Sequence, residues 1–310
     1  MRTLTLTGSD RPVPAVVLGL MRIQDKTDEE IRTLVGTAID HGIDFFDHAD
    51  VYGRVEHGCE RRFAEAMALS PAQREQVVLQ SKCGIVRSGP YFDFSAEHIL
   101  RSVDGSLDAL GTDYLDILLL HRPDALVEPE EVAAAFDELH ASGKVRAFGV
   151  SNHTPGQIDL LRRYVRQPIV ANQVQLSITH APLVAQGVAA NMQGLDQSID
   201  RDNGTLDYCR LHDITLQAWS PLQAGFFTGP FLGSPEYPEL NAVVERLAAQ
   251  YDVAPLAIAT AWITRHPARM QVVLGTTTPQ RVIDAAAGSD LPLTRAEWYE
   301  LFRAAGYCVP

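Results

Sequence analysis

The sequence of 310 residues has few cysteines and no cysteine pair with the spacing of a metal site or a redox motif. Its cysteines, Cys59, Cys83, Cys209 and Cys308, are scattered, which indicates reduced thiols rather than a disulfide framework. No segment approaches the roughly 18 consecutive apolar residues of a membrane span, and Met1–Leu6 lacks the apolar core of a secretory signal. We therefore expect a cytoplasmic protein without a bound metal.

Positive charge is also scarce in this sequence. Lys and Arg number 26 against 39 Asp and Glu, which gives a formal net charge of −13, and no run of basic residues occurs. Long-range attraction to nucleic acid or to an anionic membrane is therefore not expected, and an anionic ligand would need a local site. Hydrophobic residues make up 46% of the chain, enough for a sizeable core. We expect residues 1–310 to form one domain.

Short apolar segments alternate with longer amphipathic segments along the whole chain. The pattern predicts strands at Ala15–Leu20, Ile43–Asp47, Val77–Lys82, Leu115–His121, Ala147–Val150, Ile169–Gln173, Thr215–Trp219 and Gln271–Leu274. It predicts helices at Asp28–His41, Glu56–Ala68, Ala96–Leu110, Glu130–Ser142, Pro155–Val165, Asn203–His212 and Leu256–Arg265. The segment Ser177–Asn203 has little periodicity and is interpreted as an elaborated loop.

Serial strand–helix units without a long polar linker favour a closed α/β structure, a (β/α)8 TIM barrel. Leu4–Leu6 and Val13-Pro14 predict a small N-terminal β-hairpin that caps the bottom of the barrel. The alternative is an open doubly wound sheet, which would need a glycine-rich turn after its first strand. Leu18-Gly19-Leu20-Met21-Arg22 is no such turn, so the sequence favours the barrel.

Polar residues follow several of the predicted strands at the ends where a barrel carries its chemistry. Asp47, Lys82 and His121 end three successive strands, and Tyr52 lies on the loop after the second. An ammonium beside a tyrosine lowers the phenol pKa, and a carboxylate would hold that ammonium in place. The four residues predict a proton donor beside a site for a carbonyl oxygen, which His121 could polarise.

A proton donor reduces nothing without a source of hydride, so this set of residues implies a nicotinamide cofactor. Ser151, Asn152 and Gln173 end the fifth and sixth predicted strands, where they could hold the carboxamide of that cofactor.

Seven sequence blocks resemble the aldo-keto reductase superfamily. They are GIDFFDHADVYG (42–53), QSKCG (80–84), DYLDILLLHRPD (113–124), GKVRAFGVSNHT (143–154), ANQVQ (171–175), AWSPL (218–222) and GTTTPQRV (275–282). Several blocks in the right order are far more specific than one motif. Within the superfamily the chain is most similar to bacterial NADP-dependent oxidoreductases whose substrate is unassigned.

This resemblance implies reduction of an aldehyde or ketone to an alcohol, with a catalytic tetrad of Asp47, Tyr52, Lys82 and His121. It also implies that Ser151, Asn152 and Gln173 contact the nicotinamide amide, and that Ser220, Pro221 and Leu222 follow the pyrophosphate. The positions that bind the 2′-phosphate of NADP in relatives are occupied here by Gly275, Thr276 and Arg281. Compared with these relatives, the chain lacks the basic residue at Gly275 but keeps Arg281. The expected cofactor is therefore NADP, with NAD as the alternative.

Two other functions remain open at this point. The superfamily includes barrel subunits that bind the cofactor and regulate potassium channels with little turnover, so the chain could be an interaction subunit. A barrel enzyme that forms a Schiff base on Lys82 is the second alternative.

Two local features also carry expectations. His48 and Asp50 are expected to make structural hydrogen bonds. The loop Gly225–Pro238 contains four aromatic residues, Phe226, Phe227, Phe231 and Tyr237. We expect them to form a lid that covers the cofactor; the alternative is a small hydrophobic cluster.

Overall fold

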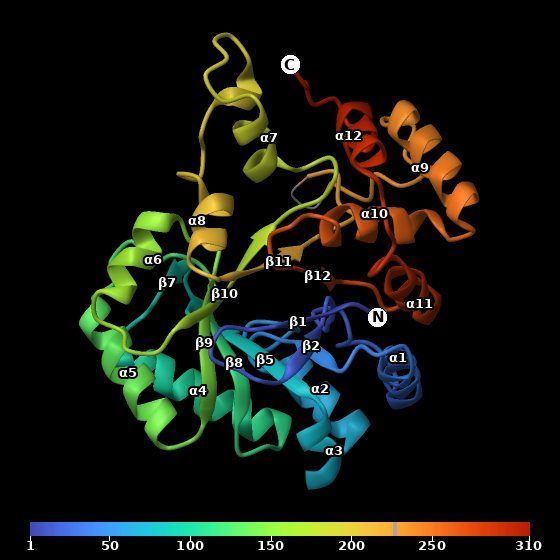
Figure 1. The fold of residues 1–310 in the computed structure, drawn as a ribbon. Coiled ribbons are helices and arrows are strands. Elements are labelled where there is room, and N and C mark those ends of the chain that lie inside the picture. Colours follow the sequence, from blue (N-terminus) through green and yellow to red (C-terminus); the bar gives the residue numbers. More distant parts are fainter. Residues whose placement is uncertain (226–227) are drawn as a thin grey trace.

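A closed barrel of eight parallel strands forms the centre of the computed structural model, which describes residues 1–225 and 228–310 (Figure 1). Its strands follow one another around the barrel in chain order, and the last pairs with the first. They are β3 (Val16–Gly19), β4 (Phe45–Asp47), β5 (Val78–Cys83), β8 (Leu115–Leu120), β9 (Val145–Ser151), β10 (Ile169–Gln175), β11 (Thr215–Trp219) and β12 (Met270–Leu274). Each predicted strand is present, so the predicted barrel is confirmed.

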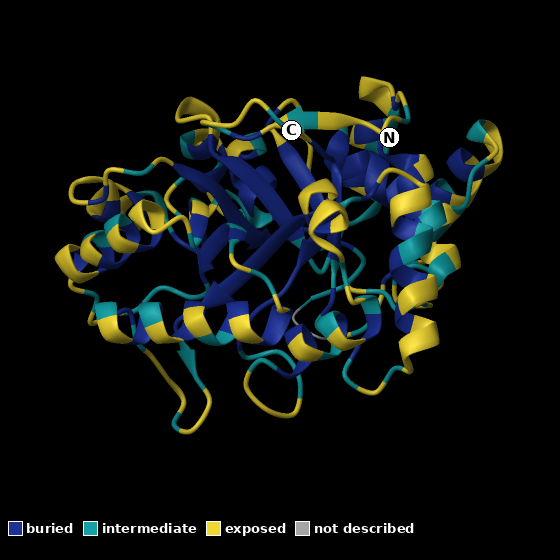
Figure 2. Cartoon of the chain, turned by 90° about the horizontal axis from the view of Figure 1, so that it is seen from below, coloured by how far each residue is buried: buried dark blue, intermediate teal, exposed yellow. Residues whose placement is uncertain are grey.

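Burial on both faces explains why these strands read as apolar runs rather than as alternating patterns. All residues of β4, β5 and β12 are buried. Figure 2 shows the strands as a buried centre, surrounded by helices whose outward sides are exposed. The charged residues that the strands contain therefore need partners inside the barrel.

The seven predicted helices are all present, with ends that differ by a few residues. They are α1 (Asp28–Asp40), α2 (Gly58–Met67), α4 (Ala96–Leu110), α5 (Pro129–Ala141), α6 (Pro155–Arg162), α8 (Thr205–Leu211) and α10 (Pro255–Thr264). Local chemistry sets several ends: Thr27 and Glu30 form a capping box at the start of α1. Gly111 ends α4 in the left-handed conformation, with a φ of 61°.

Further elements were not predicted. They are the helices α3 (Pro71–Gln76), α7 (Pro182–Val188), α9 (Pro238–Tyr251), α11 (Pro279–Gly288) and α12 (Arg295–Ala304), the 3-10 turn η1 (Asp196–Ser198) and the hairpin of β6 (Ile85–Val86) and β7 (Tyr91–Phe92). Here α7 and η1 lie within Ser177–Asn203, so interpreting that segment as a loop was wrong in part. Proline stands at the first turn of α3, α7, α9 and α11, where it is compatible with a helix, and this signal could have located them.

The predicted N-terminal hairpin is also present. β1 (Thr3–Thr5) pairs antiparallel with β2 (Pro12–Pro14). Leu6 and Val13 belong to a hydrophobic cluster with Phe45, Val78 and other inward residues of the barrel strands. The hairpin therefore closes the end of the barrel at which the strands begin.

The chain after α12 is held against the segment that follows β10. Tyr307 stacks on Phe302, and its hydroxyl accepts a hydrogen bond from the Ala181 amide at 2.7 Å and donates to the Thr179 carbonyl at 3.2 Å. Among the residues described, no helix has both the length and the apolar composition that crossing a bilayer requires.

Two helical glycines offer a matched test of the packing. A Cβ on Gly288 would lie 2.8 Å from Cα of Ala257 in the neighbouring α10 and closer still to its carbonyl oxygen, whereas a Cβ on Gly36 in α1 would meet nothing within 4 Å. We expect Gly288→Ala to destabilise the protein by about 1–3 kcal/mol, because two helix backbones must separate. Gly36→Ala should stabilise it by up to about 1 kcal/mol. Chemical denaturation measures both, and equal effects of the two variants would contradict this account of the packing.

Candidate functional site

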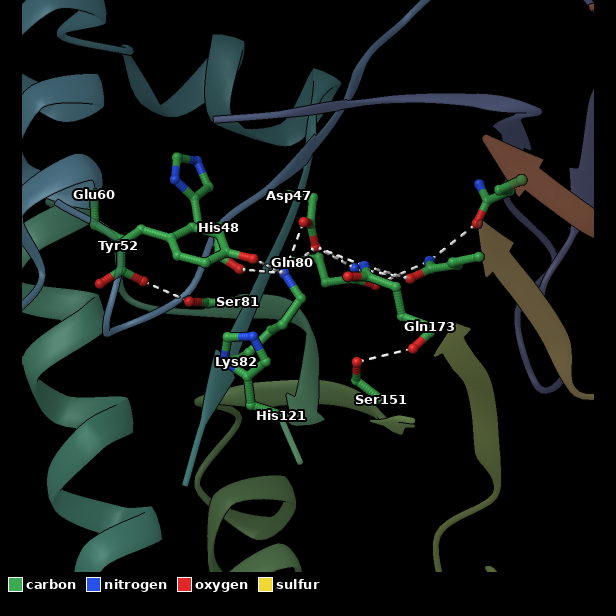
Figure 3. A network of polar contacts seen from close by, with 12 residues as sticks. Asp47, His48, Tyr52, Glu60, Gln80, Ser81, Lys82, His121, Ser151 and Gln173 are labelled. Carbon is green, nitrogen blue, oxygen red and sulfur yellow. Dashed lines mark hydrogen bonds and ion pairs between the residues drawn. The ribbon is translucent and has the colours of Figure 1, made fainter. Parts of the chain in front are cut away.

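Four side chains converge at the end of the barrel where the strands finish (Figure 3). Asp47 is the last residue of β4 and Lys82 lies in β5, while His121 directly follows β8. Tyr52 comes from the loop after β4, with its ring edge to face with His121 at a centroid distance of 5.7 Å. The structure thus brings together the four residues expected to form the tetrad.

A buried ion pair lies at the base of this group. Lys82 Nζ donates to both carboxylate oxygens of Asp47, at 2.8 and 2.7 Å, and to the backbone oxygen of His48 at 2.7 Å. The side chains of Lys82 and Asp47 are 0% and 3% exposed. Removing two charges from water is costly, so the pair is stable only if its remaining hydrogen-bonding capacity is satisfied.

Glutamine side chains inside the barrel supply those hydrogen bonds. Gln80 and Gln173 donate to Asp47 Oδ1 at 2.6 and 3.0 Å. Both also donate to Gln217 Oε1, and Gln217 in turn donates to Gln271 at 3.0 Å. The network joins β4, β5, β10, β11 and β12, and the sequence analysis did not identify Gln80, Gln217 or Gln271 as functional residues.

Tyr52 lies above the ion pair, with its hydroxyl 3.3 Å from Lys82 Nζ. Burial raises the pKa of Tyr52 above its usual 10, and the opposing effect of Lys82 reduces the rise without cancelling it. The expectation of a lowered tyrosine pKa was therefore wrong in net direction, although Lys82 acts in the expected sense. The phenol keeps its proton at neutral pH, as a proton donor must.

Lys82 is enclosed rather than presented to the cavity. Burial lowers the pKa of Lys82, but Asp47 and Tyr52 outweigh it and raise the pKa above its usual 10.5. A charged, buried ammonium whose nitrogen contacts Asp47, His48 and Tyr52 has no lone pair to attack a carbonyl carbon. This geometry argues against a Schiff base on Lys82.

His121 is a neutral imidazole. Burial, together with Lys82 and Arg122, lowers the pKa of His121 well below its usual 6.5. Its Nδ1 is buried and has no hydrogen-bond partner among the described residues. A neutral imidazole can donate a hydrogen bond to an oxygen without carrying a charge into the site.

The residues expected at the nicotinamide amide form a second cluster beside the tetrad. Asn152 Nδ2 donates to Ser151 Oγ at 2.8 Å, and Trp219 Nε1 donates to Asn152 Oδ1 at 3.0 Å. Asn152 has a φ of 62°, a left-handed conformation that asparagine tolerates better than most residues. Gln173 lies with them, but its amide nitrogen donates to Asp47 and Gln217. Gln173 therefore connects this cluster to the buried ion pair.

A cavity of about 500 Å³ spans both clusters. Every predicted site residue except Lys82 lines it, including Ser220, Pro221 and Leu222 after β11 and Gly275, Thr276 and Arg281 after β12. The sequence analysis did not assign Met21, Val51, Ile85, Arg122 and Trp219 to the site, although they line the cavity too. Arg22, at the same cavity, donates to the Gly275 carbonyl at 3.0 Å.

Two of the four aromatic residues expected to form a lid, Phe231 and Tyr237, belong to the hydrophobic core instead. Phe231 is fully buried in the hydrophobic core and Tyr237 packs against the same core. Phe226 and Phe227 lie outside the described residues. Pro230, from the same loop, lines the cavity.

A second buried polar group lies behind Tyr52. Glu60 accepts hydrogen bonds from Ser81 Oγ and pairs with His57 Nδ1 at 2.6 Å. The side chains of His48 and Asp50 are also fully buried, yet neither makes a hydrogen bond to a described residue. The expectation of structural hydrogen bonds for both was therefore wrong. Burial lowers the pKa of His48 to about 4, so this ring is neutral.

Asp50 offers a pH-dependent test of this buried group. Burial, reinforced by Glu60 and Glu56 and opposed by His57, raises the pKa of Asp50 to about 7 from its usual 3.8. The raised pKa contributes stability that is complete below pH 3.8 and is lost as the pH rises through about 7. Asp50→Asn cannot ionise, so its stability relative to the wild type should increase by about 3 kcal/mol between about pH 5 and about pH 8.

Thermal and chemical denaturation at several pH values measure this difference. Asp290→Asn, at an exposed carboxyl, is the matched control and should follow the wild type. A constant difference between Asp50→Asn and the wild type over this range would mean that Asp50 is charged in the folded protein throughout.

Comparison with known proteins agrees with this geometry. The sequence profile of the aldo/keto reductase family matches residues 15–304. The uncharacterized oxidoreductase YcsN of Bacillus subtilis is 37% identical over 308 residues, which cover 95% of each chain. Oxidoreductase YdhF of Escherichia coli is 35% identical over 95% of this chain and 94% of its own. A 6-dehydroglucose reductase of Agrobacterium fabrum is 32% identical over 94% of this chain and 93% of its own.

A solved structure shows the same fold. The thermostable aldo-keto reductase Tm1743, in complex with the inhibitor epalrestat, superimposes with a TM-score of 0.77 and covers 98% of this chain and all of its own, at 24% identity. The three sequence relatives are named oxidoreductases or reductases, so they favour an enzyme and give no support to the regulatory subunit.

Proposed function

This chain belongs to the aldo/keto reductase family, and we propose that it reduces its substrate with Tyr52 as the proton donor and NADPH as the preferred cofactor. The family makes it an oxidoreductase that reduces the carbonyl group of an aldehyde or ketone with a nicotinamide cofactor. The observation that carries the proposed roles is the Tyr52–Lys82–Asp47 arrangement at one end of the cavity. The proposed proton donor follows from this arrangement, and the proposed cofactor follows from the cationic residues after β3 and β12.

Tyr52 is the proposed proton donor because it combines an acidic hydrogen, a place on the cavity and a charged neighbour. Its hydroxyl gives a proton to the carbonyl oxygen as that oxygen gains negative charge. Lys82, 3.3 Å away, stabilises the phenolate that remains. Asp47 keeps Lys82 charged and directed at the hydroxyl. Uptake of a proton from solvent then restores Tyr52.

His121 is the proposed second contact of the carbonyl oxygen. Its ring is neutral and lies edge to face with Tyr52, so both can reach one oxygen atom. A neutral donor polarises the carbonyl without competing with Tyr52 for the transferred proton. In this scheme, reduction adds a hydride to the carbonyl carbon and a proton to its oxygen.

The residues present fit a nicotinamide cofactor. Hydroxyl and amide groups of Ser151, Asn152 and Gln173 gather at one part of the cavity, where a carboxamide needs both donors and acceptors. When bound there, the reduced nicotinamide supplies the hydride. Ser220, Pro221 and Leu222 would follow the pyrophosphate along the same cavity.

The preference for NADPH is proposed from the positive charge that follows β3 and β12. Arg22 and Arg281 both line the cavity, and neither forms an ion pair with an acidic residue in the described part of the chain. Thr276 adds a hydroxyl beside them. A guanidinium that is not neutralised by the protein favours a phosphate, which the 2′-phosphate of NADPH provides and NADH lacks.

Replacement of Tyr52 tests the proton donor. Tyr52→Phe retains the ring and removes the hydroxyl, so kcat should fall by about 10²- to 10⁴-fold with any carbonyl substrate that the wild type reduces. Binding of NADPH, followed by protein fluorescence, should change little because the hydroxyl does not lie among the amide-binding residues. Turnover close to that of the wild type would refute the assignment of Tyr52.

Titration with both cofactors tests the proposed preference. We expect the wild type to bind NADPH more tightly than NADH, and Arg281→Gln to weaken NADPH binding by about 10-fold with little effect on NADH. Arg303→Gln, an exposed arginine on α12, is the control. Equal affinity of the wild type for the two cofactors would contradict the NADPH preference and leave carbonyl reduction in place.

A further inference from the structure

Arg122 is a cavity residue whose charge is not neutralised by any residue that the structure describes. It directly follows His121 after β8, lines the cavity and is half-buried. Its guanidinium forms no hydrogen bond or ion pair with any residue that the structure describes. Its recorded contact is with the ring of Trp219, whose centroid lies 5.7 Å from Cζ.

Arg74, a buried arginine, shows how this protein pairs a guanidinium that is withdrawn from water. Arg74 pairs with Asp116 at 2.8 Å and donates to Thr112 and to the carbonyl of Tyr114. A guanidinium presents five donors in a fixed planar fork, which suits carboxylate and phosphate oxygens. Arg122 has the same fork, partly withdrawn from water, with all of its donors unused by described residues. Such a group favours an oxyanion in the cavity.

The position of Arg122 separates it from the residues proposed to bind the 2′-phosphate of the cofactor. In the strand order of the barrel, β8 lies diametrically across from β12, whose end carries Gly275 and Thr276. Arg22 already reaches Gly275 on that side. Arg122 instead directly follows His121, whose pKa it lowers, and Tyr52 raises the pKa of Arg122; His121 and Tyr52 are the two residues proposed to hold the carbonyl oxygen.

The adjacent positions of His121 and Arg122 limit how far apart the carbonyl and the anionic group of a substrate can be. Neighbouring residues have Cα atoms about 3.8 Å apart, so a ligand that contacts both His121 and Arg122 needs to span only a few bonds. Met21, Val51 and Ile85 add apolar side chains to the lining of the cavity, which suit a short hydrocarbon link.

We propose that Arg122 anchors an oxyanion of the substrate, and that the preferred substrates are short aldehydes or ketones with a carboxylate or phosphate within about three carbons of the carbonyl. This proposal rests on the proposed function, because Tyr52 and His121 fix where the carbonyl lies. The guanidinium holds the oxyanion through paired N–H···O bonds, and the apolar side chains of the lining contact the carbon chain.

Matched substrate pairs test the proposal in the full-length enzyme with NADPH. The carboxylate pair is 4-oxobutanoate and its methyl ester, and the phosphate pair is glyceraldehyde 3-phosphate and glyceraldehyde. In each pair, kcat/KM should be about 10- to 100-fold higher for the anion. Arg122→Gln should abolish that ratio, and Arg122→Lys should restore part of it. Arg163→Gln, an exposed arginine at the end of α6, should keep the wild-type ratio.

The outcomes are distinguishable. Preference confined to one pair identifies the oxyanion as carboxylate or as phosphate. Equal turnover within both pairs, or an Arg122→Gln variant with the wild-type ratio, overturns the proposal and leaves the proposed reductase intact. A proportional loss on anionic and neutral substrates also overturns it, because Arg122 would then act on the fold or the cofactor. Failure of the wild type to reduce any carbonyl compound while it binds NADPH would refute the proposed function itself.

Calorimetry provides a readout that does not depend on turnover. In the presence of NADP⁺, butanoate should bind at least about 10-fold more tightly than the neutral butanamide, neither of which has a hydroxyl to oxidise, and Arg122→Gln should remove the difference. Equal affinities in the wild type would count against an oxyanion anchor.

Discussion

The ion pair between Lys82 and Asp47 is the interaction on which the rest of the site depends. Both charges lie inside the barrel, where the loss of one partner would leave the other uncompensated at a cost of about 3–5 kcal/mol. The protein satisfies the carboxylate with two glutamine donors besides the ammonium. Since these donors come from β5 and β10, on different sides of the barrel, the charge is stable only when the barrel is closed. The fold and the chemistry are thus coupled through one carboxylate.

The cavity carries positive charge although the protein as a whole is negatively charged. The chain carries a formal net charge of −13, yet its cavity is lined by three arginines, and the carboxylate that reaches it is paired with Lys82. A site of this kind has to act locally, because the field of the whole protein repels anions at long range. Affinity for an anionic ligand therefore depends on direct guanidinium contacts, which salt screens less when they are partly buried.

The sequence predicted the barrel and the four convergent side chains because both follow from strand ends, which short apolar runs mark clearly. It did not predict the glutamine network: Gln80, Gln217 and Gln271 lie within buried strands, and nothing in a single sequence tells which buried amides meet across a barrel. The sign of the Tyr52 pKa shift was missed for a related reason, since it depends on how burial and Lys82 balance. Helices α9, α11 and α12 were not predicted, although proline in the first turn of α9 and α11 and the capping box of Thr294 and Glu297 in α12 mark where they begin.

Tyr52, the proposed proton donor, depends on several other side chains for its position and charge, whereas Arg122, the proposed substrate anchor, depends on few. Tyr52 depends on Lys82, which depends on Asp47, which depends on side chains from two further strands. A change at any of these positions disturbs the charge at the centre of the barrel. Arg122 lies next to His121 in sequence, but its side chain supports no other described residue through a hydrogen bond or ion pair. Under the proposed anchoring, a substitution at Arg122 changes which carbonyl compound is held without changing how the proton is transferred.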